Sequence, residues 1–132
     1  MAKAEKYEAR LLEALKPVME PDETLRAWTI ATVGGDPGQA TMLFGTVGLA
    51  VQMWCYVALT DRRVFLWHCD SFWRPLDGWQ ADPAAQVRLE IGAPGLFTKA
   101  VYHRPDGAIV PLRVQRKWKA SMERIAAALA AR

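Results

Sequence analysis

The chain of 132 residues has few of the side chains that build reactive or metal-binding centres, with only two cysteines and two histidines. Cys55 and Cys69 are too few for a disulfide framework and lack a C-x-x-C spacing. No Pro-, Gly- or Ser-rich linker and no internal repeat divides the chain. We therefore expect one domain over residues 1–132, with strands within 24–115 and the ordinary composition of a globular protein.

Charge is absent from residues 37–60, a run long enough to cross a bilayer. Its glycines and glutamines lower its hydropathy and favour loops, so a membrane span is the weaker interpretation. The first residues carry mixed charges where an export signal needs an apolar core, so we expect a cytoplasmic location.

The scarce chemistry-bearing residues form no recognisable centre. A tetrahedral metal site would have to use both cysteines and both histidines, His68 and His103. His68, Cys69 and Asp70 are adjacent, but in a strand they point to alternate faces and cannot converge. We expect no catalytic residue, no metal and no cofactor.

Both ends of the chain show helical periodicity. Residues 4–16 predict an amphipathic helix, with Tyr7, Leu11, Leu12 and Leu15 on its apolar side. Residues 117–131 predict a second helix. Its apolar face consists of Trp118, Met122, Ile125 and Leu129.

Short strands with turn signals fill the region between the helices. We expect them at 24–33, 53–60, 63–69, 71–80, 85–91, 97–104 and 108–115. Pro105-Asp106-Gly107 is the strongest hairpin signal. Pro111 indicates an edge strand or a bulge, because proline cannot donate to a sheet ladder.

The best-defined hairpin turns at Asp61 and Arg62. A two-residue turn there pairs Cys55 with His68 and Cys69 with Trp54, which places the two sulfurs on opposite faces. One face then carries Val57, Leu59, Val64 and Leu66, and the other carries the aromatic patch Trp54, Tyr56, Phe65 and Trp67. Such a patch is too large to remain in water, so either the first helix or a second subunit should cover it. The chain has six tryptophans, which again implies much covered surface.

Residues 56–66, Tyr-Val-Ala-Leu-Thr-Asp-Arg-Arg-Val-Phe-Leu, resemble the signature hairpin of bacterial pleckstrin-homology-like (PH-like) domains, whose relatives include the GRAM domain. The leading helix, residues 21–25, the turn at 105–107 and the closing helix are similar in order and spacing. The resemblance implies an α+β, mainly β fold: a bent antiparallel sheet or partly open barrel of about seven strands, with an N-terminal helix and a C-terminal capping helix. It also implies a non-catalytic binding or scaffolding module. The apolar insert at 39–53 and the tryptophans of 71–83 depart from the family pattern.

Basic residues suggest where an anionic partner could bind. Six Lys and Arg stand against one acidic residue between positions 99 and 119. The candidate binding residues are Arg62, Arg63, Arg113, Arg116, Lys117 and Lys119. An anionic lipid or a small anion would fit them, a solvated rim is the alternative, and no nucleic-acid motif is present.

Three functions stay open at this point. The first is a non-catalytic PH-like module that self-associates, so that its partner is a second copy or another protein. The second is a small-molecule binder or enzyme with a pocket under the 39–53 insert, lined by Phe44, Trp54 and Trp79. The third is peripheral attachment to a membrane surface through that insert, aided by Arg62, Arg63 and the basic rim of residues 99–119.

Overall fold

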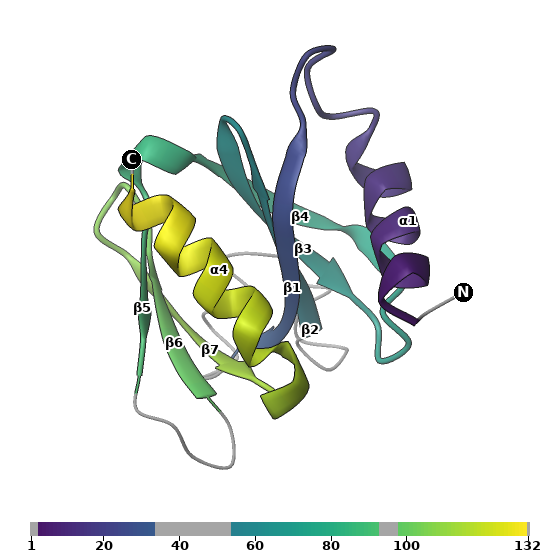
Figure 1. The fold of residues 1–132 in the computed structure, drawn as a ribbon. Coiled ribbons are helices and arrows are strands. Elements are labelled where there is room, and N and C mark those ends of the chain that lie inside the picture. Colours follow the sequence, from purple (N-terminus) through teal and green to yellow (C-terminus); the bar gives the residue numbers. More distant parts are fainter. Residues whose placement is uncertain (1–2, 34–53, 93–97, 132) are drawn as a thin grey trace.

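The computed structural model describes residues 3–33, 54–92 and 98–131 (Figure 1). The helical elements are α1 (Lys3–Leu15), η1 (Ala84–Gln86), η2 (Arg116–Trp118) and α4 (Lys119–Ala130). The strands are β1 (Leu25–Val33), β2 (Trp54–Thr60), β3 (Arg63–Cys69), β4 (Pro75–Pro83), β5 (Arg88–Ile91), β6 (Thr98–His103) and β7 (Ile109–Val114). The expected 39–53 insert lies outside the described residues, and so does Phe44, one of the three residues expected to line a pocket beneath it.

The seven strands form one antiparallel sheet in the order β4-β3-β2-β1-β7-β6-β5. Among the described residues, β1 pairs with β2 along most of its length and with β7 at Thr32 and Val33. The sheet bends at this junction, so that β5, β6 and β7 lie at an angle to the other strands (Figure 1). The mainly β, α+β class expected from the sequence is confirmed.

The C-terminal helix closes the concave side of the bent sheet. α4 packs against β1, in the middle of the sheet, and against the edge strand β5. Its periodic residues Met122, Ile125 and Leu129 are buried, as the spacing predicts. The first turn differs from the prediction, because residues 116–118 form the short helix η2 before α4 begins. In the described part of the chain, no helix is long and apolar enough to span a membrane.

The register of the β2–β3 hairpin is the predicted one. Cys55 lies opposite His68, and Cys69 lies opposite Trp54. Both cysteines are free and fully buried. Because successive residues of a strand point to opposite faces, the two thiols are separated by the sheet.

Three strand predictions need correction. The strand expected at 85–91 begins at Arg88, because residues 84–86 form the short helix η1. β4 begins at Pro75 rather than at 71, because residues 70–74 form a tight turn in which the side chain of Asp70 accepts hydrogen bonds from two backbone amides. β7 is an inner strand with an unbroken register to β6, so the edge strand or bulge expected at Pro111 is wrong. Among the described residues β1 reaches β7 no further than Leu112, so the missing N–H of Pro111 removes no ladder bond.

Candidate functional site

The aromatic patch of β2 and β3 is covered by the chain itself. Tyr56 and Phe65 are completely buried, and Trp67 is nearly so. Helix α1 lies over this face: Leu11 and Leu15 are fully buried, whereas Leu12, expected to join them, points outward and is 38% exposed. Helix α1 thus separates most of the patch from the solvent. Self-association of the protein stays a prediction.

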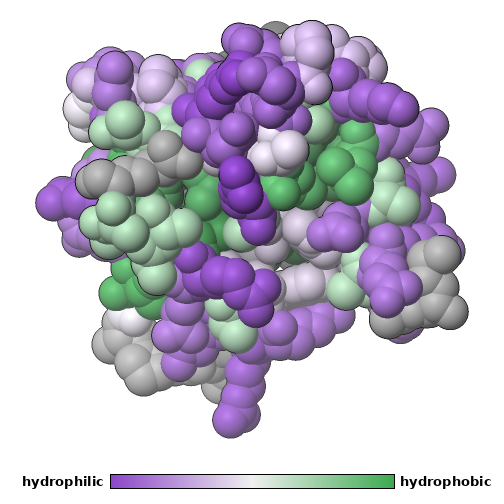
Figure 2. Space-filling view, turned by 45° about the horizontal axis from the view of Figure 1, so that its top comes forward, coloured by the Kyte–Doolittle hydropathy of each residue, from purple (hydrophilic) through white to green (hydrophobic). Residues whose placement is uncertain are grey.

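Arg62 and Arg63 hold two turns together at one end of the sheet. Arg62 pairs with the exposed carboxylates of Glu20 and Asp22, while Arg63 Nη2 donates to Glu23 Oε1 at 2.6 Å. This end comes forward in Figure 2, where the surface is largely hydrophilic and hydrophobic residues show mainly in hollows. The guanidinium groups of these two candidate binding residues are thus already occupied.

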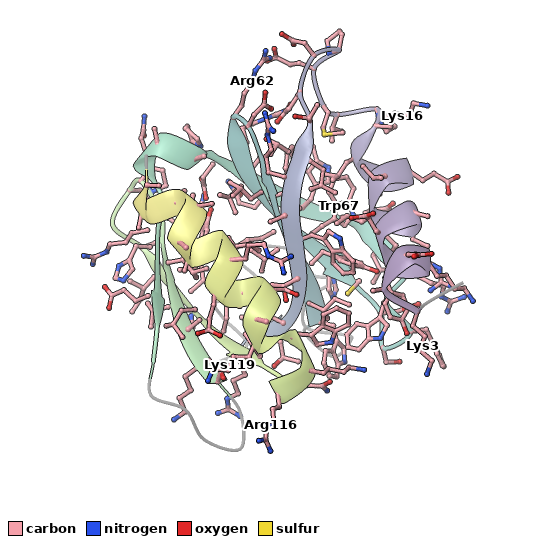
Figure 3. All side chains as sticks on the ribbon, viewed as in Figure 1. Lys3, Lys16, Arg62, Trp67, Arg116 and Lys119 are labelled. Carbon is pink, nitrogen blue, oxygen red and sulfur yellow. The ribbon has the colours of Figure 1, made fainter. Side chains whose placement is uncertain are left out.

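The remaining candidates lie at the opposite end of the sheet, where Arg116 and Lys119 are far from Arg62 (Figure 3). Here one row of paired residues crosses five strands: Cys69 on β3, Trp54 on β2, Thr32 on β1, Arg113 on β7 and Lys99 on β6. η2 and the start of α4 follow β7 directly. We call this group the basic end; it consists of Lys99, Arg113, Arg116, Lys117 and Lys119.

Within the described residues, no opposite charge is paired with the basic end. The ion pairs found among the described residues all lie elsewhere, and no carboxylate in that part of the chain pairs with the five cations. Segments 34–53 and 93–97 add Asp36 as their one charged residue. Lys117 Nζ lies 5.5 Å from the ring centroid of Trp118, while Lys99 and Arg113 are exposed. This end therefore presents concentrated positive charge to the solvent.

Lys99 and Arg113 face each other directly across β6 and β7, and like charges in that position destabilise a sheet. We expect Lys99→Glu to raise the free energy of unfolding by about 0.2–1 kcal/mol, because it replaces repulsion by an ion pair. Urea unfolding at low salt measures this difference, and the free energy of unfolding of Lys99→Gln should lie between those of the wild type and Lys99→Glu. A lower stability for Lys99→Glu would contradict the pairing.

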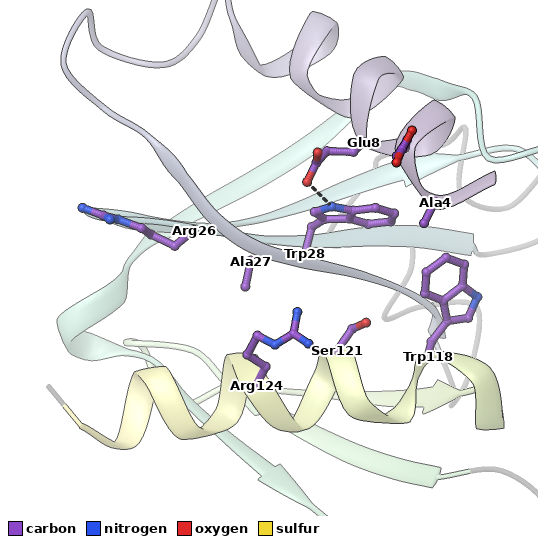
Figure 4. Close-up of a pocket in the computed structure, with 9 residues that line it drawn as sticks. Ala4, Glu8, Arg26, Ala27, Trp28, Trp118, Ser121 and Arg124 are labelled. Atoms are coloured by element: carbon purple, nitrogen blue, oxygen red, sulfur yellow. Dashed lines mark hydrogen bonds between the residues drawn. The ribbon is translucent and has the colours of Figure 1, made fainter. Parts of the chain in front are cut away.

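A groove of about 270 Å³ runs between α1 and α4 over the first half of β1 (Figure 4). Glu5 and Glu8 line its α1 side, and Arg124 and Ser121 line its α4 side. The indole of Trp28 already donates to Glu8 Oε1 at 2.9 Å. Because its two walls carry opposite charges, the groove is a weaker candidate for an ionic partner than the basic end.

Several buried titratable groups lie outside the basic end. Tyr102 donates its hydroxyl to Asp82 at 2.8 Å, and Arg104 contacts the same carboxylate. Burial raises the pKa of the Cys55 thiol to about 12, which leaves it protonated at neutral pH. Cys69 and His68 lie on opposite faces of β3, so the adjacent His-Cys-Asp residues do not converge.

Lys99 is the member of the basic end that was absent from the predicted binding set. Its sequence signal was available, because a three-residue turn at Pro105-Asp106-Gly107 pairs position 99 with position 113. The exposed Phe72 of the β3–β4 turn was also missed, since the sequence placed it in a strand.

The comparisons with known proteins give a fold and no family. No family model and no curated protein matches the chain. Among solved structures, the hSac2 domain from human phosphoinositide phosphatase Sac2 is similar, with a TM-score of 0.57 and 13% sequence identity. The match covers 98% of this chain and 81% of that chain. At this identity the similarity is one of fold.

Proposed function

We propose that this chain is a non-catalytic binding module that docks on an anionic lipid surface through its basic end. The observation that carries the proposal is the group of five cations without a carboxylate partner in the described structure. The two cross-strand cations support it further, because their repulsion costs fold stability that binding of an anion would offset.

A lipid surface suits this arrangement better than a nucleic-acid groove. The cations come from β6, β7, η2 and α4 and gather at one end of a bent sheet rather than along one helix or groove. A polybasic cluster gains about 1 kcal/mol per Lys or Arg near an anionic membrane, within the screening length of the solution. The order of helices and strands agrees with the PH-like family that residues 56–66 resemble, and membership in that family is part of the proposal.

Arg113→Gln/Arg116→Gln is expected to weaken binding to vesicles of mixed anionic and neutral lipid about 30-fold, from about 1 kcal/mol for each charge. Co-sedimentation at low ionic strength measures it. Lys16→Gln/Arg26→Gln removes the same net charge from exposed positions nearer the Arg62 end and should leave binding close to that of the wild type. Raising the salt to 0.5 M should abolish most wild-type binding.

Two results would contradict the proposal. One is equal loss of binding in both double variants, which would indicate a response to net charge alone. The other is no wild-type binding to anionic vesicles at either salt concentration. In a parallel assay, duplex DNA of random sequence tests the nucleic-acid alternative, and tighter binding to DNA than to vesicles would replace the lipid surface as partner.

A further inference from the structure

The β3–β4 turn presents one aromatic side chain to the solvent on a rigid support. Phe72 is 69% exposed, the largest value among the exposed large apolar residues of the described chain. Asp70 Oδ1 accepts from the amides of Phe72 and Arg74 at 2.9 and 3.0 Å, and Asp70 Oδ2 accepts from Arg74 Nε at 2.7 Å. The turn therefore holds Phe72 outward by hydrogen bonds on both sides of it.

The next residue, Trp73, fixes the turn to the core. It has a φ of 63°, a left-handed conformation that is unfavourable for a bulky side chain. Its indole packs edge-on against Trp54, with ring centroids 4.6 Å apart, and its carbonyl accepts the hydroxyl of Tyr56 at 2.6 Å. These contacts hold the half-buried Trp73 against the core, while its neighbour Phe72 is exposed.

Phe72 lies at the same end of the sheet as the cations. The turn begins directly after Cys69, which is the last residue of the row that ends at Arg113 and Lys99. The ring of Tyr7 also connects the two regions, since its centroid is 6.3 Å from Trp73 and 6.3 Å from Trp118. With strands about 4.8 Å apart, the row spans about 20 Å, short enough for one flat surface to meet both parts.

Two guanidinium groups lie beside Phe72, and that of Arg74 is already paired with Asp70. The guanidinium of Arg74 lies 5.5 Å from the ring centroid, and Arg10 Nη1 donates to the carbonyl of Phe72 at 3.0 Å. An aromatic ring flanked by cations matches a bilayer interface, where the ring enters the acyl boundary and the cations meet anionic headgroups.

We infer that Phe72 is the apolar anchor of the membrane-docking surface and inserts into the anionic bilayer on which the basic end docks. This inference rests on the proposed function. Electrostatic attraction brings the basic end to the membrane surface, and Phe72 then adds an apolar contribution to the binding free energy that salt does not screen.

Phe72→Ala is expected to weaken partition into anionic vesicles about tenfold, because part of an aromatic side chain no longer leaves water. Phe72→Leu should retain most of the binding. Ile109→Ala is the matched control: Ile109 is 50% exposed and lies at the opposite end of β7 from Arg113. Both sites are exposed, so the thermal unfolding of all three variants should be close to that of the wild type.

A second measurement reports insertion directly. Phe72→Cys and Ile109→Cys are each labelled with an environment-sensitive fluorophore, which leaves Cys55 and Cys69 unmodified because both are fully buried. On addition of anionic vesicles the emission at position 72 should shift to the blue, and the emission at position 109 should not change. Brominated acyl chains should quench only the label at 72.

The outcomes separate the two proposals. If the wild type binds vesicles, the label at 72 stays in water and Phe72→Ala binds normally, the anchor is overturned and basic-end docking stands. If Phe72→Ala loses binding while the label at 72 still reports water, Phe72 affects binding without entering the bilayer, and the inference fails. If the wild type binds no vesicle, the proposed function fails and the anchor fails with it.

Discussion

Glu23→Gln is expected to lower the free energy of unfolding by about 3 kcal/mol at pH 7, the order of magnitude that corresponds to the lowered pKa of this carboxyl. The Glu23 side chain is fully buried in the turn before β1. It accepts from Thr60 Oγ1 at 2.5 Å, from Arg63 Nη2 at 2.6 Å and from the amide of Glu20 at 3.0 Å. The substitution leaves Arg63 half-buried without its charge partner, which is costly.

The stabilisation by Glu23 depends on pH in a defined direction. Burial by itself raises the pKa of Glu23, but the hydrogen bonds from Arg63, Thr60 and the Glu20 amide outweigh it and lower the pKa from 4.5 to about 2. The carboxylate therefore stabilises the fold fully above about pH 5, and this contribution is lost as the pH falls towards 2. Urea unfolding should show a constant difference between wild type and Glu23→Gln above pH 5, narrowing below it.

Glu20→Gln serves as the control for this turn. Glu20 pairs with Arg62, but its side chain is 63% exposed, so the substitution should change stability little. Equal effects of the two substitutions, or a difference that widens as the pH falls, would contradict the role given to Glu23.

Leu11→Ala is expected to cost about 2–5 kcal/mol of unfolding free energy, the range for deleting a fully buried leucine side chain. Leu11 is on the buried side of α1, which lies over the sheet face that carries Tyr56, Phe65 and Trp67. Loss of its side chain therefore also loosens the cover of that aromatic patch. We expect increased binding of an apolar dye and, at high protein concentration, association of the variant in light scattering.

The same helix supplies the control. Leu12 is 38% exposed, and Leu12→Ala should change the free energy of unfolding by less than about 0.5 kcal/mol. If the two alanine variants were equally stable, α1 would not be the cover of the aromatic patch.

The predictions from sequence succeeded where local pattern and turn chemistry decide the structure. The alternating residues around Asp61 and Arg62 predict the hairpin register, because a slip of one residue would turn every side chain to the other face. The spacing of Met122, Ile125 and Leu129 likewise predicts the buried face of α4.

They were less successful where contacts between distant segments decide. Nothing local to Arg62 or Arg63 shows that Glu20, Asp22 and Glu23 will neutralise them from another turn. Phe72 and Trp73 are predicted from sequence as strand residues, yet the side chain of Asp70 organises them into a turn that exposes the ring of Phe72 and packs the half-buried ring of Trp73 against Trp54. The 39–53 insert stays a prediction.

The central claim is that the end bearing Lys99 and Arg113, and not the Arg62 end, faces an anionic membrane. The most direct measurement is the line broadening of backbone amide signals by a paramagnetic lipid in anionic bicelles. We expect broadening at Phe72, Lys99 and Arg113, with Arg62 and Gly107 unaffected. Broadening at Arg62 and Gly107 instead, or at none of these residues, would contradict the account.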